Sequence, residues 1–434
     1  MTTRSQFVTL FASLQWLGFM FANTVVIPLS TSAAFHLTTN QTAGVMAKAF
    51  ILTGLACLLQ VWLGHRFPLM EGQSGLWWGV ILTIASLGAS SHTSLTTIGG
   101  SLALGMLLGG VALVLAGLLG VHKVLNRLFT PVVMSVLLIL LASKLIDIFF
   151  KGMLGMQNSS HVHVGIALLS VVIVVVVSIL TIGTKGIISN FSILIGLSLG
   201  WVSYVLIFGS KQAPIVPSWQ EIGQVFTWGS LPYTHGTPID WGIVIAGIVT
   251  ALLNTTNTIA TLRAAEPLFE TDMPDTAYRR SLVWSGVFTM TSGVFSQVPY
   301  APYTSSIGFL RTTRILERLP FVVGAVLFML MGLVPYVSGF FSTMPFAVGA
   351  AVLFVAYLQL FGSALQNIEG MHFNFRTIFR LAVPVLAGLA IQSMPPDSFS
   401  TLPSMAQSIV GNGMLMGILI ALVLENIISW DKLD

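Results

Sequence analysis

The sequence predicts an all-α, polytopic membrane protein, and three observations support this fold class. Only 7% of the 434 residues are charged and 55% are hydrophobic, whereas a soluble domain carries about 25% charged residues. Apolar runs of roughly 20 residues recur along the chain, which is the helix length that crosses a bilayer. These runs are continuous, so they indicate helices rather than the short alternating strands of a membrane barrel.

Polar breaks divide the chain into about fourteen apolar segments, seven on either side of a wetter stretch. The predicted segments are 8–30, 43–64, 76–90, 96–120, 131–150, 163–182, 188–208, 241–262, 280–297, 304–315, 319–340, 345–364, 377–394 and 405–429. An odd number of segments per half would invert the second half relative to the first, which is a recurrent transporter design. We therefore predict a first inverted repeat over 1–208, a central loop over 209–240 and a second repeat over 241–434.

The basic residues predict how the chain is oriented in the membrane. If the N-terminus is cytoplasmic, most of the 18 Lys and Arg residues fall on the inner side. The exceptions are Lys48, Lys144, Lys151 and Lys211. This bias follows the positive-inside rule and predicts two cytoplasmic termini in the cell inner (plasma) membrane. Because topology explains the net charge of +4, no nucleic-acid partner is expected.

The third and tenth segments are interrupted by turn-forming residues at corresponding positions of the two halves. The third begins Glu71-Gly72-Gln73-Ser74-Gly75, and the tenth begins Pro299-Tyr300-Ala301-Pro302-Tyr303. The two prolines prevent regular helix before Tyr303. Paired interrupted segments indicate a binding site at the membrane midplane, with the N-termini of half-helices facing it. The alternative is a pair of kinked helices that pack for structural reasons.

Three stretches have residues typical of a known family. They are Leu14-Gln15-Trp16 with Thr24-Val25-Val26-Ile27-Pro28, then Asn254-Thr255-Thr256-Asn257-Thr258, and finally Ser305 to Arg314. In the last stretch, Gly308, Thr313 and Arg314 match a family signature, whereas Ser305 and Ser306 do not. On these residues the chain resembles the nucleobase–ascorbate transporters, also called the uracil/xanthine permease family, over nearly its whole length.

This resemblance implies a fold and a class of substrate. It implies fourteen helices in two inverted repeats, with short extended strands in segments 3 and 10 that cross at mid-membrane. It also implies a core domain at about 8–120 plus 241–340 and a gate domain at about 131–208 plus 345–429. Members mostly carry uracil, xanthine, uric acid or other purines, often driven by protons. The gate domain is the surface where a homodimer would form.

Two departures from the family pattern change the expected site. The positions of the family's two binding carboxylates fall at Asn254 and Ser305, and its eighth-segment histidine falls near Thr258. A carboxylate only accepts hydrogen bonds, whereas Asn offers a donor and an acceptor, and Ser serves as either. The resemblance therefore implies a neutral site for a purine such as adenine, hypoxanthine or guanine. A coupling proton, a coupling sodium ion and facilitated diffusion all stay open, and no cofactor is expected.

The predicted substrate-binding residues lie in four segments. They are Asn23, Gly75, Trp77, Asn254, Thr258, Tyr303, Thr304 and Ser305. Tyr303 and Trp77 are candidates for stacking on a base, and Thr304 and Ser305 for binding it through backbone amides. The pair Asn23-Thr24 is echoed by Asn257-Thr258, as expected for repeats that face one cavity. Alternatively, such polar residues hold helices together, and Trp77 is an interfacial anchor.

The charged residues expected within the membrane are Lys48, Asp147 and Glu425. Charged residues at such positions are functional candidates by default. None lies where the family couples protons. The sequence contains no His-Glu-x-x-His, Gly-x-Ser-x-Gly or P-loop motif, so we predict that the protein is not an enzyme. Two alternatives to a nucleobase permease remain: a small-anion transporter of the same architecture, and a non-transporting sensor with a degenerate site.

Overall fold

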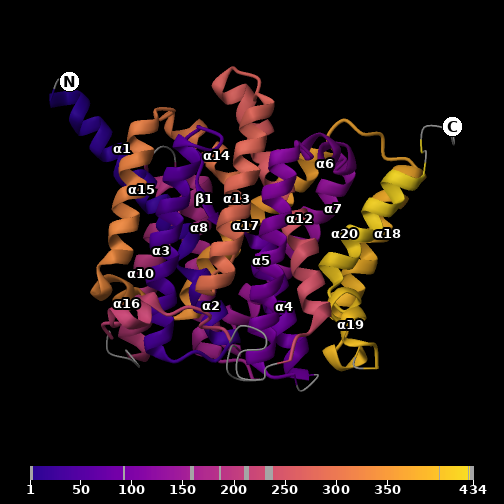
Figure 1. The fold of residues 1–434 in the computed structure, drawn as a ribbon. Coiled ribbons are helices and arrows are strands. Elements are labelled where there is room, and N and C mark those ends of the chain that lie inside the picture. The colour runs from indigo at the N-terminus through magenta and orange to yellow at the C-terminus, as the bar shows by residue number, and fades with distance from the viewer. Residues whose placement is uncertain are drawn as a thin grey trace.

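The computed structural model is a bundle of helices around two short buried strands (Figure 1). It describes residues 3–90, 93–156, 161–184, 187–209, 215–229, 238–399, 401–428 and 430. Two parts of the topology prediction, the position of Lys211 and that of the C-terminal residues 431–434, lie outside the described residues. Within it, eight helices are long and apolar enough to cross a membrane, or nine if one bent pair counts as a single span. The protein is therefore mostly helical and multi-pass. The count of fourteen spans, the inverted repeats and the two domains stay predictions.

The first half contains ten helices and one strand among the described residues. They are α1 Thr3–Thr24, α2 Val26–Ala34, α3 Thr39–Trp62, β1 Glu71–Gln73, α4 Gly75–Ser90, α5 Leu95–Leu119, α6 His122–Leu128, α7 Pro131–Met153, α8 Val164–Gly183, α9 Ile187–Asn190 and α10 Ser192–Phe208. Side-chain caps set several of these boundaries. Thr38 and Gln41 form a capping box before α3, and Ser94 and Thr130 cap α5 and α7. Such caps satisfy amides that a helix N-terminus leaves unpaired.

The second half repeats the pattern of long helices with one short strand. Its elements, with the short helix of the central loop, are α11 Trp219–Gly223, α12 Trp241–Phe269, α13 Asp275–Phe295, β2 Tyr300–Pro302, α14 Ser305–Thr313, α15 Arg318–Leu333, α16 Pro335–Ser342, α17 Phe346–Asn367, α18 Phe375–Ser393, η3 Pro396–Phe399, α19 Ser404–Val410 and α20 Gly413–Ile427. Asp240 caps α12 by accepting hydrogen bonds from the amides of Gly242 and Ile243. Helix α1 begins and α20 ends on the same side of the bundle (Figure 1).

Four predicted segments are each divided into two helices: 8–30 into α1 and α2, 188–208 into α9 and α10, and 319–340 and 405–429 as follows. The segment predicted at 319–340 bends by 83° between α15 and α16. Pro335 begins α16 and has no amide hydrogen to continue the helical ladder, so the direction changes there. The segment predicted at 405–429 separates into α19 and α20 around Asn412, whose side chain caps α20. Hydropathy alone did not reveal these breaks because each run is predominantly apolar on both sides of its break.

Close helix packing places glycines where another residue would clash. A Cβ atom on Gly110 of α5 would lie 2.6 Å from the carbonyl oxygen of Gly286 in α13, and one on Gly105 would lie 2.9 Å from that of Val244 in α12. Small residues allow membrane helices to approach closely, which strengthens van der Waals packing. Helix α5 therefore packs closely against α12 and α13, the two helices that precede β2. This packing fixes the position from which the chain enters β2.

Candidate functional site

The two strands cross inside the bundle and pair with each other. β1 and β2 are antiparallel, with Glu71 opposite Pro302 and Gln73 opposite Tyr300, and both are fully buried. The ladder continues at its ends, where Ser74 N donates to Pro299 O at 2.8 Å. The strands predicted in the third and tenth segments are therefore present. Two halves of the chain meet here by backbone hydrogen bonds, which satisfies polar groups far from water.

Helix α4 starts directly after β1, so its N-terminus faces the crossing. Trp78 N donates to Ser74 O at 2.9 Å, and the preceding amides, from Gly75 to Trp77, are those that a helix start leaves unpaired. A Cβ atom on Gly75 would lie 3.3 Å from Leu145 in α7. The start of α4 therefore presents amide donors and a partial positive charge close to another helix.

Helix α14 starts in the same way after β2, and one of its faces is open. Thr304, Ser305 and Gly308 are exposed, and their spacing of three and four places them on one face of the helix. A Cβ atom on Gly308 would meet nothing within 4 Å. Within the described chain, the amides of Thr304 and Ser305 find no backbone acceptor. This face therefore combines free amides, two hydroxyls and room for a ligand.

Asn254 of α12 is buried, and its side chain already holds both sides of the crossing. Its amide nitrogen donates to Tyr300 O in β2 at 3.1 Å. Its oxygen accepts the hydroxyl of Ser74 at 2.6 Å and the amide of Asn257 at 3.0 Å. The predicted substrate-binding residue thus has its donor and acceptor engaged by the protein, so a ligand would have to compete with these hydrogen bonds.

Asn257 lies one turn further along α12 and is only half-buried. Its amide nitrogen faces Asn254 and also Ser74, whose hydroxyl is 3.4 Å away. Among the described residues, its oxygen accepts no hydrogen bond. The sequence pattern 254, 257, 258 and 261 marks one helical face, and this spacing indicates Asn257 as well as Asn254. Thr258, by contrast, is buried at 1% exposure.

Thr261 joins α12 to the second strand and to α14. Its hydroxyl donates to Pro302 O at 3.1 Å and shares a hydrogen bond of 2.9 Å with the Thr304 hydroxyl. This residue was not predicted as part of the site, although it completes the helical face that begins at Asn254. The three contacts of α12 therefore fix β2 and the start of α14 as one unit.

Tyr303 faces β1 across the crossing. Its hydroxyl donates to Gln73 O, and its ring covers Gly72, where a Cβ atom would lie 2.8 Å from the ring. Its own amide donates to Met70 O at 2.9 Å. Tyr303, which was predicted to stack on a base, therefore packs against β1 and is hydrogen-bonded to it. Its ring leaves room only for glycine at position 72.

The aromatic and amide residues predicted on the first and third segments are buried. Trp77 is fully buried, and its indole nitrogen has no hydrogen-bond partner within the described residues. It is therefore not an interfacial anchor. Trp78 is also buried and donates to the Ser30 hydroxyl at 2.7 Å. Asn23 donates to the Phe19 carbonyl oxygen at 2.8 Å, within its own helix.

The expected set of intramembrane charges was incomplete, because Glu71 is fully buried in β1. Its Oε1 lies 3.4 Å from Nε2 of buried His65, and Nδ1 of His65 accepts the amide of Phe67 at 3.0 Å. In a neutral imidazole the proton must then be on Nε2, which faces Glu71. The sequence shows Glu71 only as part of a polar break, and pairing with β2 is what carries it into the interior.

The three charges that were expected at depth have structural partners. Lys48 donates to Gln224 O at 2.8 Å and to the Thr227 hydroxyl at 3.0 Å, so it ties the central loop to α3. Asp147 pairs with Lys151 at 2.9 Å, and both are about half exposed. Glu425 receives two hydrogen bonds from Arg380, of 2.6 and 2.7 Å. In the described part of the chain, no group of three His, Cys, Asp or Glu residues could hold a metal ion.

The chain is similar to known proteins in sequence and in fold. A family model described as "Permease family" matches residues 7–396. The protein named "Putative purine permease YwdJ" of Bacillus subtilis (strain 168) is 29% identical over 97% of this chain and 96% of its own length. The xanthine permease of the same organism is 25% identical, over 96% and 93%. Among solved structures, the transmembrane domain of a cyanobacterium bicarbonate transporter, BicA, has the same fold with a TM-score of 0.63 at 16% identity, over 97% of this chain and 98% of that one.

Proposed function

The chain belongs to the permease family, in which its relatives are nucleobase transporters rather than enzymes, and from this premise we propose that it moves a purine across the cytoplasmic membrane by alternating access. It is a multi-pass membrane protein. The observation that carries the proposal is that the polar groups near the strand crossing are neutral: half-buried Asn257 beside Asn254, and exposed Thr304 and Ser305 at the start of α14.

The chemistry of this face favours an oxopurine such as hypoxanthine or guanine. The free amides at the start of α14 suit a carbonyl oxygen, because a helix N-terminus offers donors and partial positive charge. The Asn257 side-chain oxygen supplies an acceptor for an N–H group of the base, whereas its amide nitrogen is already directed at Asn254 and Ser74. Asn254, Thr261 and Tyr303 would hold the two strands and α14 in place around the base.

Coupling through the family's carboxylate positions is not expected in this chain. Those positions hold Asn254 and Ser305, and neither side chain ionises at physiological pH. Transport would then be facilitated diffusion, or it would use a proton or sodium ion bound elsewhere. Adenine, which lacks a carbonyl oxygen, is the natural comparison substrate.

The experiment is uptake of radiolabelled bases by the purified protein in proteoliposomes, with and without an inward proton gradient. We expect saturable uptake of hypoxanthine or guanine, weaker uptake of adenine, and no more than a small effect of the gradient. If no base is taken up or competes, the proposal is wrong. Saturable binding without uptake would favour a sensor.

A second candidate function is anion transport. Two half-helix N-termini that meet at one place form a typical anion site, and the fold is shared with a bicarbonate transporter. Against it, the basic residues of α14, Arg311 and Arg314, lie at its far end. Labelled bicarbonate is therefore included in the same uptake panel, and its saturable transport without base uptake would establish the alternative.

A further inference from the structure

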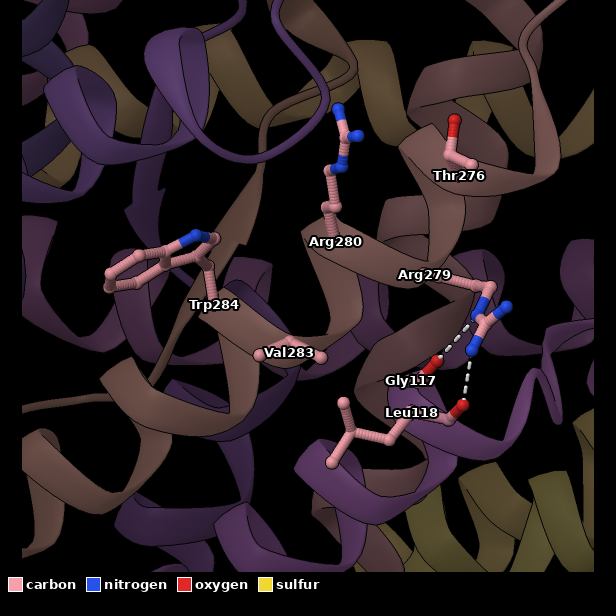
Figure 2. A pocket seen from close by; sticks show the side chains of 7 residues that line it. All are labelled: Gly117, Leu118, Thr276, Arg279, Arg280, Val283 and Trp284. Carbon is pink, nitrogen blue, oxygen red and sulfur yellow. Dashed lines mark hydrogen bonds between the residues drawn. The ribbon is translucent and has the colours of Figure 1, made fainter.

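A pocket of about 320 Å³ lies where the end of α5 meets the start of α13 (Figure 2). Its lining residues are Gly117, Leu118, Thr276, Arg279, Arg280, Val283 and Trp284. None of these belongs to β1, β2, α4, α12 or α14. The pocket is therefore separate from the strand crossing and from the proposed base site.

The local packing explains why a hollow forms here. Gly117 lets α13 approach closely, since a Cβ atom there would lie 2.8 Å both from Arg279 O and from the Val283 side chain. Helix α5 then ends at Leu119, and Gly120 turns the chain with a φ of +73°. The two helices thus touch at Gly117 and separate just beyond it, which leaves a notch at their ends.

The two arginines of the pocket have different roles, and Figure 2 shows them pointing in different directions. Nε of Arg279 donates to Gly117 O at 3.2 Å, and its Nη2 donates to Leu118 O. Arg279 is therefore used to cap the C-terminus of α5, where carbonyls are unpaired and a cation is favoured. Arg280 is exposed, and no described residue forms an ion pair with it.

The pocket offers positive charge without a compensating acid. None of its lining residues is acidic. The nearby carboxylate of Asp275 is engaged by Lys123 at 2.6 Å. The Arg280 guanidinium, together with the Thr276 hydroxyl, is thus available to an anionic group, and guanidinium is well suited to phosphate.

One wall of the pocket continues into a surface that lipid must cover. Leu108, Val111, Leu115 and Leu118 of α5 are 42–56% exposed, and their spacing forms a single apolar stripe along the helix. In a membrane-spanning helix such a stripe contacts acyl chains. Trp284, partly exposed at the opposite wall, is a residue type enriched at the membrane–water boundary.

We propose that this pocket binds an anionic phospholipid of the cytoplasmic leaflet. Its phosphate would contact Arg280 and Thr276, its glycerol region would pack on Trp284, and an acyl chain would follow the α5 stripe from Leu118. The end of α5 and the start of α13, which line the pocket, lie on the side of the bundle where α1 begins and α20 ends (Figure 1). The basic residues predict that side to be cytoplasmic. Basic pockets between helices on that side are typical sites for anionic headgroups.

The test is native mass spectrometry of the purified full chain in detergent, with equal amounts of phosphatidylglycerol and phosphatidylcholine added. We expect the protein to retain phosphatidylglycerol in preference to phosphatidylcholine. Arg280→Gln should weaken phosphatidylglycerol retention about fivefold, since one surface charge contributes about that factor, and Arg280→Lys should keep most of it. Phosphatidylcholine retention should not change.

The matched control is Arg318→Gln, which removes an exposed arginine at the start of α15 on the same side of the bundle. Equal loss with Arg318→Gln would assign the effect to general surface charge and overturn the site. So would full retention by Arg280→Gln, or equal retention of the two lipids by the native protein. Displacement of phosphatidylglycerol by inorganic phosphate alone would identify an anion site instead of a lipid site. No outcome depends on base transport.

Discussion

The amide nitrogen of Asn254 in α12 donates a hydrogen bond of 3.1 Å to the backbone carbonyl of Tyr300 in β2. The same side chain accepts the Ser74 hydroxyl, which follows β1. One residue therefore binds both strands of the crossing, and it occupies the position where the family resemblance implies a substrate carboxylate. In this chain we infer that it preserves the geometry of the site, whereas Asn257 beside it contacts the substrate.

Asn254→Ala should abolish uptake through loss of structure at the crossing. The change leaves the Ser74 hydroxyl and the Tyr300 carbonyl without their partner, and each unsatisfied buried group costs about 1–3 kcal/mol. We expect the protein to reach the membrane but to unfold at a lower temperature, measured by thermal melting in detergent. Unchanged uptake with an unchanged melting temperature would show that Asn254 neither stabilises the crossing nor binds the substrate.

Asn257→Ala should weaken substrate binding while the fold keeps its stability. Asn257 is half-buried, and its oxygen has no acceptor role among the described residues, so truncation leaves little unpaired. We expect KM for the base to rise about tenfold, the effect of losing roughly 1.4 kcal/mol of hydrogen bonding. Uptake kinetics and thermal melting, done beside Asn254→Ala, separate the two residues. A large loss of stability would contradict the assignment.

Ser305→Glu should change which bases are carried. Ser305 is exposed on the open face of α14, so a glutamate there needs no new cavity. Its carboxylate only accepts hydrogen bonds, and we expect preference to shift toward bases with N–H edges, such as xanthine and uracil. Uptake should also become more dependent on the proton gradient. A competition panel at two pH values measures both effects, with Ser305→Gln as the uncharged control.

Gly72→Ala should destabilise the crossing. The new Cβ atom would lie 2.8 Å from the ring of Tyr303, and overpacking of this kind costs about 1–3 kcal/mol. We expect a lower melting temperature and reduced uptake. Gly308→Ala is the matched control for stability, because a Cβ atom there meets nothing within 4 Å. Equal melting temperatures for the two variants would show that Tyr303 moves aside freely.

Arg380→Leu should destabilise the protein more than the double variant Arg380→Leu with Glu425→Leu. The Glu425 side chain is 1% exposed, and without Arg380 only the neutral Thr130 hydroxyl, at 3.0 Å, would still donate to it. A buried carboxylate that loses its charged partner costs about 3–5 kcal/mol. Replacing both residues removes the charge together with its need for a partner. Thermal melting of the two variants tests this order, and the reverse order would mean that Glu425 finds another donor.

The sequence was most informative where local chemistry decides the structure. Proline and glycine beside polar residues predicted that both segments are interrupted, because Pro299 and Pro302 exclude regular helix. The family resemblance then implied the two strands at these interruptions. Apolar length predicted most of the long helices. The bend at Pro335 was missed, although it has a local cause, because the segments were counted by hydropathy and not by proline position.

What the sequence did not predict depends on contacts between distant parts of the chain. The engagement of Asn254 requires Ser74, which is 180 residues away, and no local pattern specifies that pairing. Burial of Glu71 likewise results from the pairing of β1 with β2. The role of Lys48 depends on the central loop that folds back onto α3. Residue type therefore indicated which side chains lie near the strand crossing. It did not indicate which of them are already hydrogen-bonded within the protein and which could bind a ligand.

The pairing of Gln73 with Tyr300 also bears on how the protein is made. While the ribosome is still synthesising the second half, β1 has no partner, and its backbone groups cannot remain unpaired in lipid. The first half must therefore wait, with this segment near water or held by the insertion machinery, until β2 has been added. Contacts of such long sequence separation form late. The strand crossing therefore cannot form before β2 has been synthesised, and a half-length chain should be cleared by membrane proteases.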